Sequence, residues 1–136
     1  MKKVLFPLTM LAFFILAGCG ATSAAQGGAG GGNAAGPATI TMDAANFQPN
    51  NGKVTVQAGR AVTFKDPAAT GGLHILVVGV NGKLTSQAGA PAELNTPMGL
   101  TINAGDTKPI TFATAGTYKI TCTIHPYMEV TVVVTA

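Results

Sequence analysis

The stretch TYKITCTIHPYMEVTVVVT, residues Thr117 to Thr135, contains two segments with a period of two, joined by a short loop. In each segment apolar residues alternate with residues that are mostly polar, which is typical of β-strands with one buried face. The positions that share the apolar face are Tyr118, Ile120, Cys122, Val130, Val132 and Val134. We therefore predict two strands that direct these side chains, Cys122 included, into a hydrophobic core.

The rest of the chain from Ala38 onward consists of further short strand-like segments separated by turn residues. They are ATITMD, KVTVQ, AVTFK, LHILVVGV, GLTIN and KPITF. The run Leu73 to Val80 is apolar except for His74, as in a strand buried on both sides. Asn81-Gly82 after it is a hairpin turn signal. About eight short strands with frequent turns predict an all-β fold, an eight-stranded Greek-key β-barrel or sandwich.

The first 37 residues differ in composition from the rest of the chain. Residues 1–18 begin Met1-Lys2-Lys3 and continue as a short apolar run, which is the layout of a secretory signal peptide. Its end, Leu16 to Cys19, resembles the lipobox of bacterial lipoproteins, which implies that Cys19 is lipidated and becomes the first mature residue. Residues 19–37 are rich in Gly and Ala and predict a flexible tether. The folded domain is then residues 38–136.

This organisation predicts an exported protein, lipid-anchored to a membrane and facing the periplasm or the cell exterior. Removal of the signal peptide takes away Lys2 and Lys3 and leaves six basic and five acidic residues. Because the mature chain is nearly neutral and has no basic cluster, we do not expect it to bind nucleic acid. We expect a monomer.

The residues that can bind a metal are few and lie where strands meet loops. If Cys19 is lipidated, Cys122 is the only thiol left, and His74 and His125 are the only histidines. One alternative is that Cys122 and Met128 fill the core and His125 belongs to a turn. That alternative leaves His74 unexplained, because an imidazole on a buried strand needs a polar partner or a metal.

The types of these residues indicate which metal they would bind. Two imidazoles, one thiolate and a weak thioether form the His₂Cys set with an axial Met that is used for electron-transfer copper. Zinc prefers four strong ligands, and an iron–sulfur cluster needs more cysteines. The set therefore favours one copper ion.

Two segments, GTYKITCTIHPYM and NFQPNNGKVTVQAGRAVTFKDP, resemble the cupredoxins, the small blue-copper proteins. The resemblance covers nearly all of residues 38–136, and the C-x₂-H-x₂-M spacing is the short one of amicyanin-like members. It implies a Greek-key β-barrel that exchanges one electron between Cu(I) and Cu(II). The implied ligands are His74, Cys122 and His125 in the equatorial positions and Met128 in the axial position.

The chain differs from that family pattern at two positions next to the ligands. Ile75 replaces an Asn whose side chain ties the two ligand loops together, and Ile124 replaces a Pro before the second His. Unlike Pro, Ile124 has a backbone N–H. We therefore expect the backbone N–H groups of Ile75 and Ile124 to donate N–H···S bonds to the Cys122 sulfur.

These features favour an electron carrier between membrane-associated redox partners outside the cytoplasm. We expect those proteins to dock near His125, on an apolar patch formed by Pro126, Tyr127, the Gly71-Gly72 loop, Pro97 and Met98. The alternative is an exported protein that stores or delivers copper. We do not expect an enzyme, because Thr121 and Thr123 flank Cys122 where multicopper enzymes have further histidines.

Overall fold

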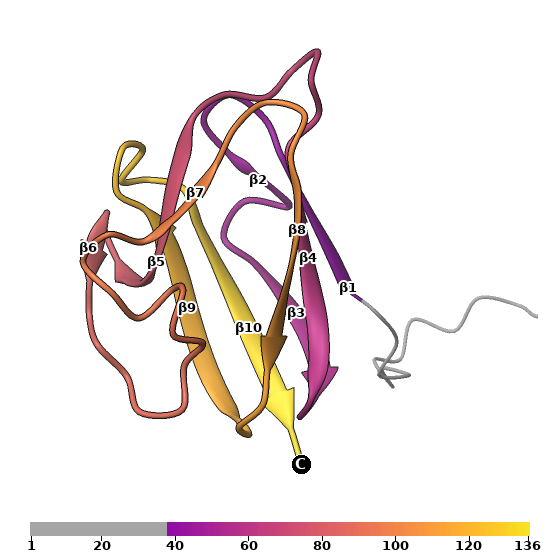
Figure 1. Ribbon diagram of the computed structural model, residues 1–136, viewed down its shortest axis with the longest axis vertical. Helices are drawn as coiled ribbons and strands as arrows, with labels where there is room; N and C mark the ends of the chain where they lie inside the picture. Colours follow the sequence, from indigo (N-terminus) through magenta and orange to yellow (C-terminus); the bar gives the residue numbers. More distant parts are fainter. Residues whose placement is uncertain (1–37) are drawn as a thin grey trace, which may run out of the picture. The chain divides into compact units, whose positions relative to one another are not determined.

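The computed structural model describes residues 38–136, which form ten β-strands (Figure 1). The predicted signal peptide, Cys19 and the tether lie outside the described residues. Residues 38–136 include no helix that could cross a membrane. The strands are β1 (Ala38–Met42), β2 (Phe47–Gln48), β3 (Gly52–Gln57), β4 (Arg60–Lys65), β5 (His74–Val80), β6 (Lys83–Leu84), β7 (Leu100–Ile102), β8 (Thr107–Phe112), β9 (Gly116–Cys122) and β10 (Glu129–Thr135).

The strands form two sheets that pack face to face as a sandwich. One sheet has the order β2-β1-β4-β8, and the other has the order β3-β10-β9-β5-β6 with β7 paired to β5. The predicted all-β class is confirmed, in the form of a sandwich with no closure into a barrel. There are ten strands instead of eight because β2 and β6 have only two residues each, which is too short to show a period.

Most strand pairs are antiparallel, but two pairs are parallel. β1 pairs with β4 and β3 pairs with β10 in parallel orientation. The alternation in the sequence predicts which residues face inward and is equally compatible with both orientations, so it does not reveal these pairs.

The core lies between the sheets and follows the predicted alternation. Each of the six inward positions of the two C-terminal strands, from Tyr118 to Val134, is buried. Tyr118 packs against Phe112 with ring centroids 5.4 Å apart, and its hydroxyl donates a hydrogen bond of 2.8 Å to the Thr114 carbonyl. This bond satisfies the one polar group of the side chain in the apolar interior.

Two residues near the site differ from the alternation. Leu73 is 49% exposed, because β5 begins only at His74. Thr121 lies on the predicted polar face of β9 but is fully buried, and its Oγ1 accepts a hydrogen bond from the Gly82 N–H at 3.0 Å. The reason is that the turn between β5 and β6 covers this part of β9.

That turn is the predicted Asn81-Gly82 hairpin. Both residues have positive φ, 52° and 70°, and Val80 pairs directly with Lys83 across them. A two-residue hairpin loop with positive φ at both positions is the turn type that Asn-Gly favours. The turn prediction is confirmed.

Candidate metal centre

The site lies at one end of the second sheet, where β5 begins and β9 ends. These strands are antiparallel neighbours, and Leu76 on β5 pairs with Cys122 on β9. His74 precedes Leu76 by two residues, so both side chains are on the same face of β5. The loop after β9 carries His125 and lies at the upper end of the sandwich in Figure 1, opposite the C-terminus.

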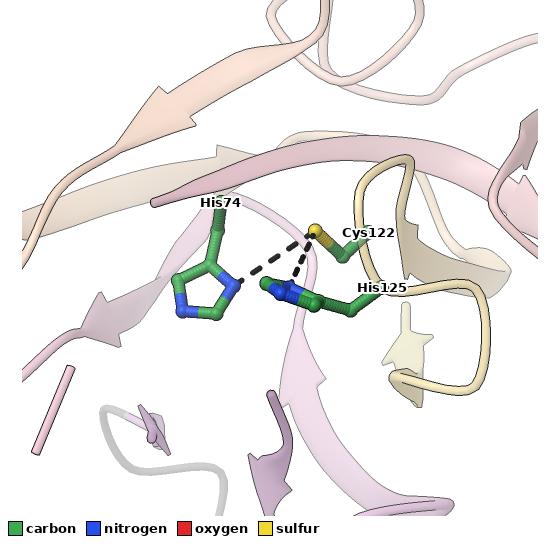
Figure 2. A group of neighbouring side chains, drawn as sticks. All are labelled: His74, Cys122 and His125. Carbon is green, nitrogen blue, oxygen red and sulfur yellow. Dashed lines mark hydrogen bonds between the residues drawn. The ribbon is translucent and has the colours of Figure 1, made fainter. Parts of the chain in front are cut away.

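Three metal-binding side chains converge at this end (Figure 2). The Cys122 sulfur is 3.8 Å from Nδ1 of His74 and 3.7 Å from Nδ1 of His125. The three donor atoms all lie within 4.8 Å of one another. Each imidazole therefore presents the same nitrogen to the sulfur, and the three donors surround one position that a single ion would occupy.

The loop that carries His125 is closed by its own backbone. The Met128 N–H donates to the His125 carbonyl at 2.9 Å, and the Cys122 N–H donates to the Met128 carbonyl at 3.3 Å. These bonds hold Met128 beside the end of β9, where its side chain is fully buried in the core cluster. The structure thus places the fourth predicted ligand in the same closed loop.

A backbone bond joins the two segments that carry the ligands. The Thr123 N–H donates to the Ile75 carbonyl at 2.9 Å. In the resembling family an Asn side chain at the position of Ile75 makes this kind of tie. Here a main-chain hydrogen bond connects the start of β5 with the loop after β9. The two segments are therefore joined even though position 75 is Ile.

The expected N–H···S bonds are not present in the structure. Within residues 38–136, the sulfur of Cys122 has hydrogen-bond contacts with the two imidazoles alone. The Ile75 carbonyl accepts a hydrogen bond from the Thr123 N–H, and the Ile124 side chain is exposed. Alternation along a strand predicts the direction of its side chains, but it does not predict where a backbone N–H in a loop points.

Burial keeps His74 in the form that can bind a metal. It lowers the pKa of His74 below the ordinary value of 6.5, while the Asp66 charge raises this pKa and His125 lowers it further. A lowered pKa favours the neutral imidazole at pH 7, whose free nitrogen lone pair is required for metal binding.

Asp66 is a residue of this region that the sequence interpretation did not single out. It is buried, and its Oδ2 lies 3.7 Å from Nε2 of His74. A signal was available, because Asp66 continues the inward alternation of Val62 and Phe64. A carboxylate at an inward position needs a partner.

The donor set suits copper. Two imidazole nitrogens and a thiol sulfur meet at one point, with a buried thioether in the same loop. This combination of soft and borderline ligands is that of electron-transfer copper sites. The residues present therefore fit the ion that the sequence predicted.

Residues 37–135 match the family described as copper binding proteins, plastocyanin/azurin family. The chain belongs to this family. The cupredoxin resemblance of the sequence is thereby confirmed, and the match and the converging His-Cys-His cluster together support a site for one copper ion.

Solved structures of cupredoxins are similar to this chain. A reduced amicyanin variant has 22% sequence identity and a TM-score of 0.51, with 74% of this chain and 83% of that chain covered. Amicyanin from Paracoccus versutus has 20% identity and a TM-score of 0.50, with 73% and 81% covered. At these identities the likeness shows the cupredoxin fold alone.

One further neighbour is part of a larger protein. A copper-containing nitrite reductase from Thermus scotoductus has 28% identity and a TM-score of 0.51. The match covers 74% of this chain but only 22% of the reductase chain. No curated protein sequence matches the chain significantly.

Proposed function

We propose that this cupredoxin carries single electrons between redox proteins at a membrane outside the cytoplasm. His74, Cys122 and His125 are the proposed equatorial copper ligands, and Met128 is the proposed axial ligand. The observation that carries the proposal is the convergence of two Nδ1 atoms on the Cys122 sulfur in a chain of the copper-binding family.

When bound, copper supplies one-electron exchange between Cu(I) and Cu(II). The protein holds the donor atoms in place. His74 and Cys122 lie on paired strands, and backbone bonds close the loop that contains His125 and Met128. Because the side chains of His74 and Cys122 are buried on a packed sheet, these two donors should keep their arrangement when bound copper changes its oxidation state.

The face around His125 suits a protein partner. The exposed large hydrophobic side chains of residues 38–136 are Leu73, Met98, Ile124 and Tyr127. Leu73 precedes His74, whereas Ile124 and Tyr127 flank His125. Exposed apolar residues grouped around a functional residue are typical of interaction sites, which supports docking of redox partners near the partly exposed His125 ring.

Met98 belongs to the same region. It precedes Gly99, which lies so close to Ile75 that an added Cβ would overlap the Ile75 side chain. The loop carrying Met98 therefore packs against the residue after His74. This contact supports the proposal that Met98 and Tyr127 are parts of one docking face.

The location follows from the proposed anchor. Cupredoxins are typically exported proteins, and the signal-like residues 1–18 followed by Cys19 support export with lipid attachment. The Gly/Ala-rich residues 19–37 would let the domain reach membrane-bound partners.

Storage or delivery of copper is the second candidate function, since it needs the same ligands but no reversible electron exchange.

A copper titration of the purified domain tests the function. Addition of Cu(II) to the metal-free protein should produce an intense blue band, because thiolate-to-copper charge transfer gives the colour. The band should saturate at about one equivalent of Cu(II), since the protein is proposed to have one site. Voltammetry of the loaded protein should show a reversible one-electron couple. A saturating blue site without a reversible couple would favour storage or delivery instead.

The Cys122→Ser variant is the matched control. It should fold as the wild type does, by circular dichroism, and stay colourless with Cu(II). A strong blue band in this variant would contradict the ligand assignment, and a wild-type protein that binds no Cu(II) would contradict the proposed function.

A further inference from the structure

Asp66 is fixed beside the metal centre by two loops. It directly follows β4, and its N–H donates to the Asp106 carbonyl at 2.9 Å. The Gly105 N–H donates to the Asp66 carbonyl at 2.7 Å. The loop between β7 and β8 therefore determines the position of the Asp66 backbone.

The carboxylate of Asp66 is held by the segment that leads to His74. Its Oδ2 accepts a hydrogen bond from the Gly72 N–H at 3.1 Å. Gly71 lies against the same carboxylate, and an added Cβ there would overlap it. The backbone thus encloses the carboxylate, and position 71 has to be a glycine for this arrangement.

The two polar side chains inside this enclosure face each other. Oδ2 of Asp66 is 3.7 Å from Nε2 of His74, and both side chains are 0% exposed. Within the part of the chain that the structure describes, Oδ1 of Asp66 and Nε2 of His74 are buried without a hydrogen-bond partner. Buried polar atoms without a partner are rare, so this pair calls for an explanation.

We propose that Asp66 is a positioning residue for the copper ligand His74. A neutral imidazole that binds a metal through Nδ1 carries its proton on Nε2, and this N–H needs an acceptor. The Asp66 carboxylate is that acceptor, and it holds His74 in the tautomer whose Nδ1 lone pair faces Cys122.

The Asp43 backbone is a second group that could accept from the His74 ring: it is near enough to raise the pKa of His74, although no hydrogen bond joins the two within residues 38–136. A hydrogen bond to an ionised carboxylate is about twice as strong as one to a neutral carbonyl. Asp66 is therefore the stronger partner, and the experiment has to separate it from Asp43.

The carboxylate also affects the two oxidation states of copper differently. A buried negative charge and a more basic imidazole stabilise Cu(II) more than Cu(I). Removal of the Asp66 charge should therefore weaken Cu(II) binding more than Cu(I) binding and raise the reduction potential. This expectation rests on copper binding at the proposed site.

The first test uses the metal-free protein and so does not depend on copper. At a pH well above the ordinary histidine pKa, ¹⁵N NMR should show the wild-type His74 ring as the Nε2–H tautomer. Asp66→Ala should shift part of the population to Nδ1–H, whereas Asp66→Asn should retain Nε2–H because its amide oxygen still accepts. An unchanged tautomer in Asp66→Ala would overturn the proposal and assign the N–H to Asp43.

The second test compares copper affinities. In Asp66→Asn and Asp66→Ala, Cu(II) affinity should fall about tenfold more than Cu(I) affinity, which raises the potential by about 59 mV for one electron. Equal losses for both ions would show a merely structural role and overturn the proposal. If Asp66→Ala does not fold, Asp66→Asn decides this test alone.

Glu93→Gln is the matched control. It removes an exposed carboxylate at a residue that, among the interactions of residues 38–136, takes no part in holding Asp66 or His74. The His74 tautomer and the affinities for Cu(I) and Cu(II) in this variant should equal those of the wild type. A loss of Cu(II) affinity like that of Asp66→Asn would overturn the proposal by showing a general effect of charge. A wild type that binds no copper would refute the function, while the NMR result would still test Asp66.

Discussion

At the scale of single residues, the site depends on which atom of each side chain faces the Cys122 sulfur. Both histidines present Nδ1, which leaves the outer edge of each ring for other contacts. His74 turns that edge toward buried Asp66, whereas His125 is only partly buried. The two ligands therefore have different surroundings, one in the core and one beside the proposed docking face.

Met128 is the residue whose role as a weak ligand is tested by substitution. Met128→Gln should keep the blue colour and lower the reduction potential, because an amide oxygen is a harder axial donor that favours Cu(II). Voltammetry of the copper-loaded variant measures this shift. Met98→Gln makes the same chemical change at an exposed position, 80% accessible, and should leave the potential unchanged. A potential that Met128→Gln does not lower would mean that Met128 only packs.

At the scale of secondary-structure elements, hairpins and their turns hold the site strands together. The turn between β5 and β6 is bonded to β9 through Gly82 and Thr121. Asn81 donates its N–H to the Glu129 carboxylate at the start of β10. One turn therefore connects the strand of His74 with the strands on either side of the ligand loop.

Removal of the Thr121 hydroxyl should weaken this connection. Thr121→Val keeps the shape of the side chain but leaves the Gly82 N–H without its acceptor, so the free energy of unfolding should fall by about 1 kcal/mol. Urea denaturation of the metal-free protein measures the change. Thr131→Val on neighbouring β10 is the control, with an expected change within about 0.5 kcal/mol. Equal stability of Thr121→Val and wild type would show that the hydroxyl bond contributes nothing.

The turn between β1 and β2 makes stability depend on pH. The Asp43 carboxylate accepts bonds from the Ala45 and Asn46 N–H groups and from Gln48. The Ala45 bond is the main cause that lowers the pKa of Asp43 below 3.8. The stability from its charge is complete above the unfolded pKa and is lost as pH falls through the lower folded pKa.

Asp43→Asn tests this dependence because the amide does not titrate. Between about pH 5 and pH 2 the wild type should lose more stability than the variant, as measured by denaturant unfolding at each pH. At pH 7 the wild type should be the more stable of the two. Parallel curves for both proteins would exclude a contribution from Asp43 ionisation.

At the scale of the whole molecule, we propose that the anchor and the copper domain are separate units of function. The family match covers residues 37–135, and Cys19 precedes it by the length of the predicted tether. The copper site is formed entirely within the matched part. Attachment to a membrane should therefore be removable without a change in the copper site.

Cys19→Ser should release the protein from the membrane fraction, because a serine accepts no thioether-linked lipid. The copper spectrum of the released protein should equal that of the wild type. Cell fractionation with immunoblotting measures the distribution, and Thr22→Ser is a control in the same segment that keeps the cysteine. Continued membrane association of Cys19→Ser would contradict a lipid anchor and indicate an uncleaved N-terminal segment.

The sequence by itself determined the features that depend on local geometry. Strand residues alternate between two faces, so the inward positions from Tyr118 to Val134 were predictable. The Asn81-Gly82 turn was predictable because both residues tolerate positive φ. Three of the four candidate ligands lie within the seven residues from Cys122 to Met128, and together with His74 their types indicated copper.

The tertiary structure alone decided the features that depend on which distant segments pack together. Three such features depend on contacts between residues far apart in the chain. They are the parallel pairing of β1 with β4, the burial of Thr121 under the turn at Gly82, and the hydrogen bond between Thr123 and Ile75. Alternation predicts that Asp66 points inward, but the loop between β7 and β8 places it against His74. Side-chain direction is a local property of the backbone, whereas the partner that a side chain meets depends on how the whole sandwich closes.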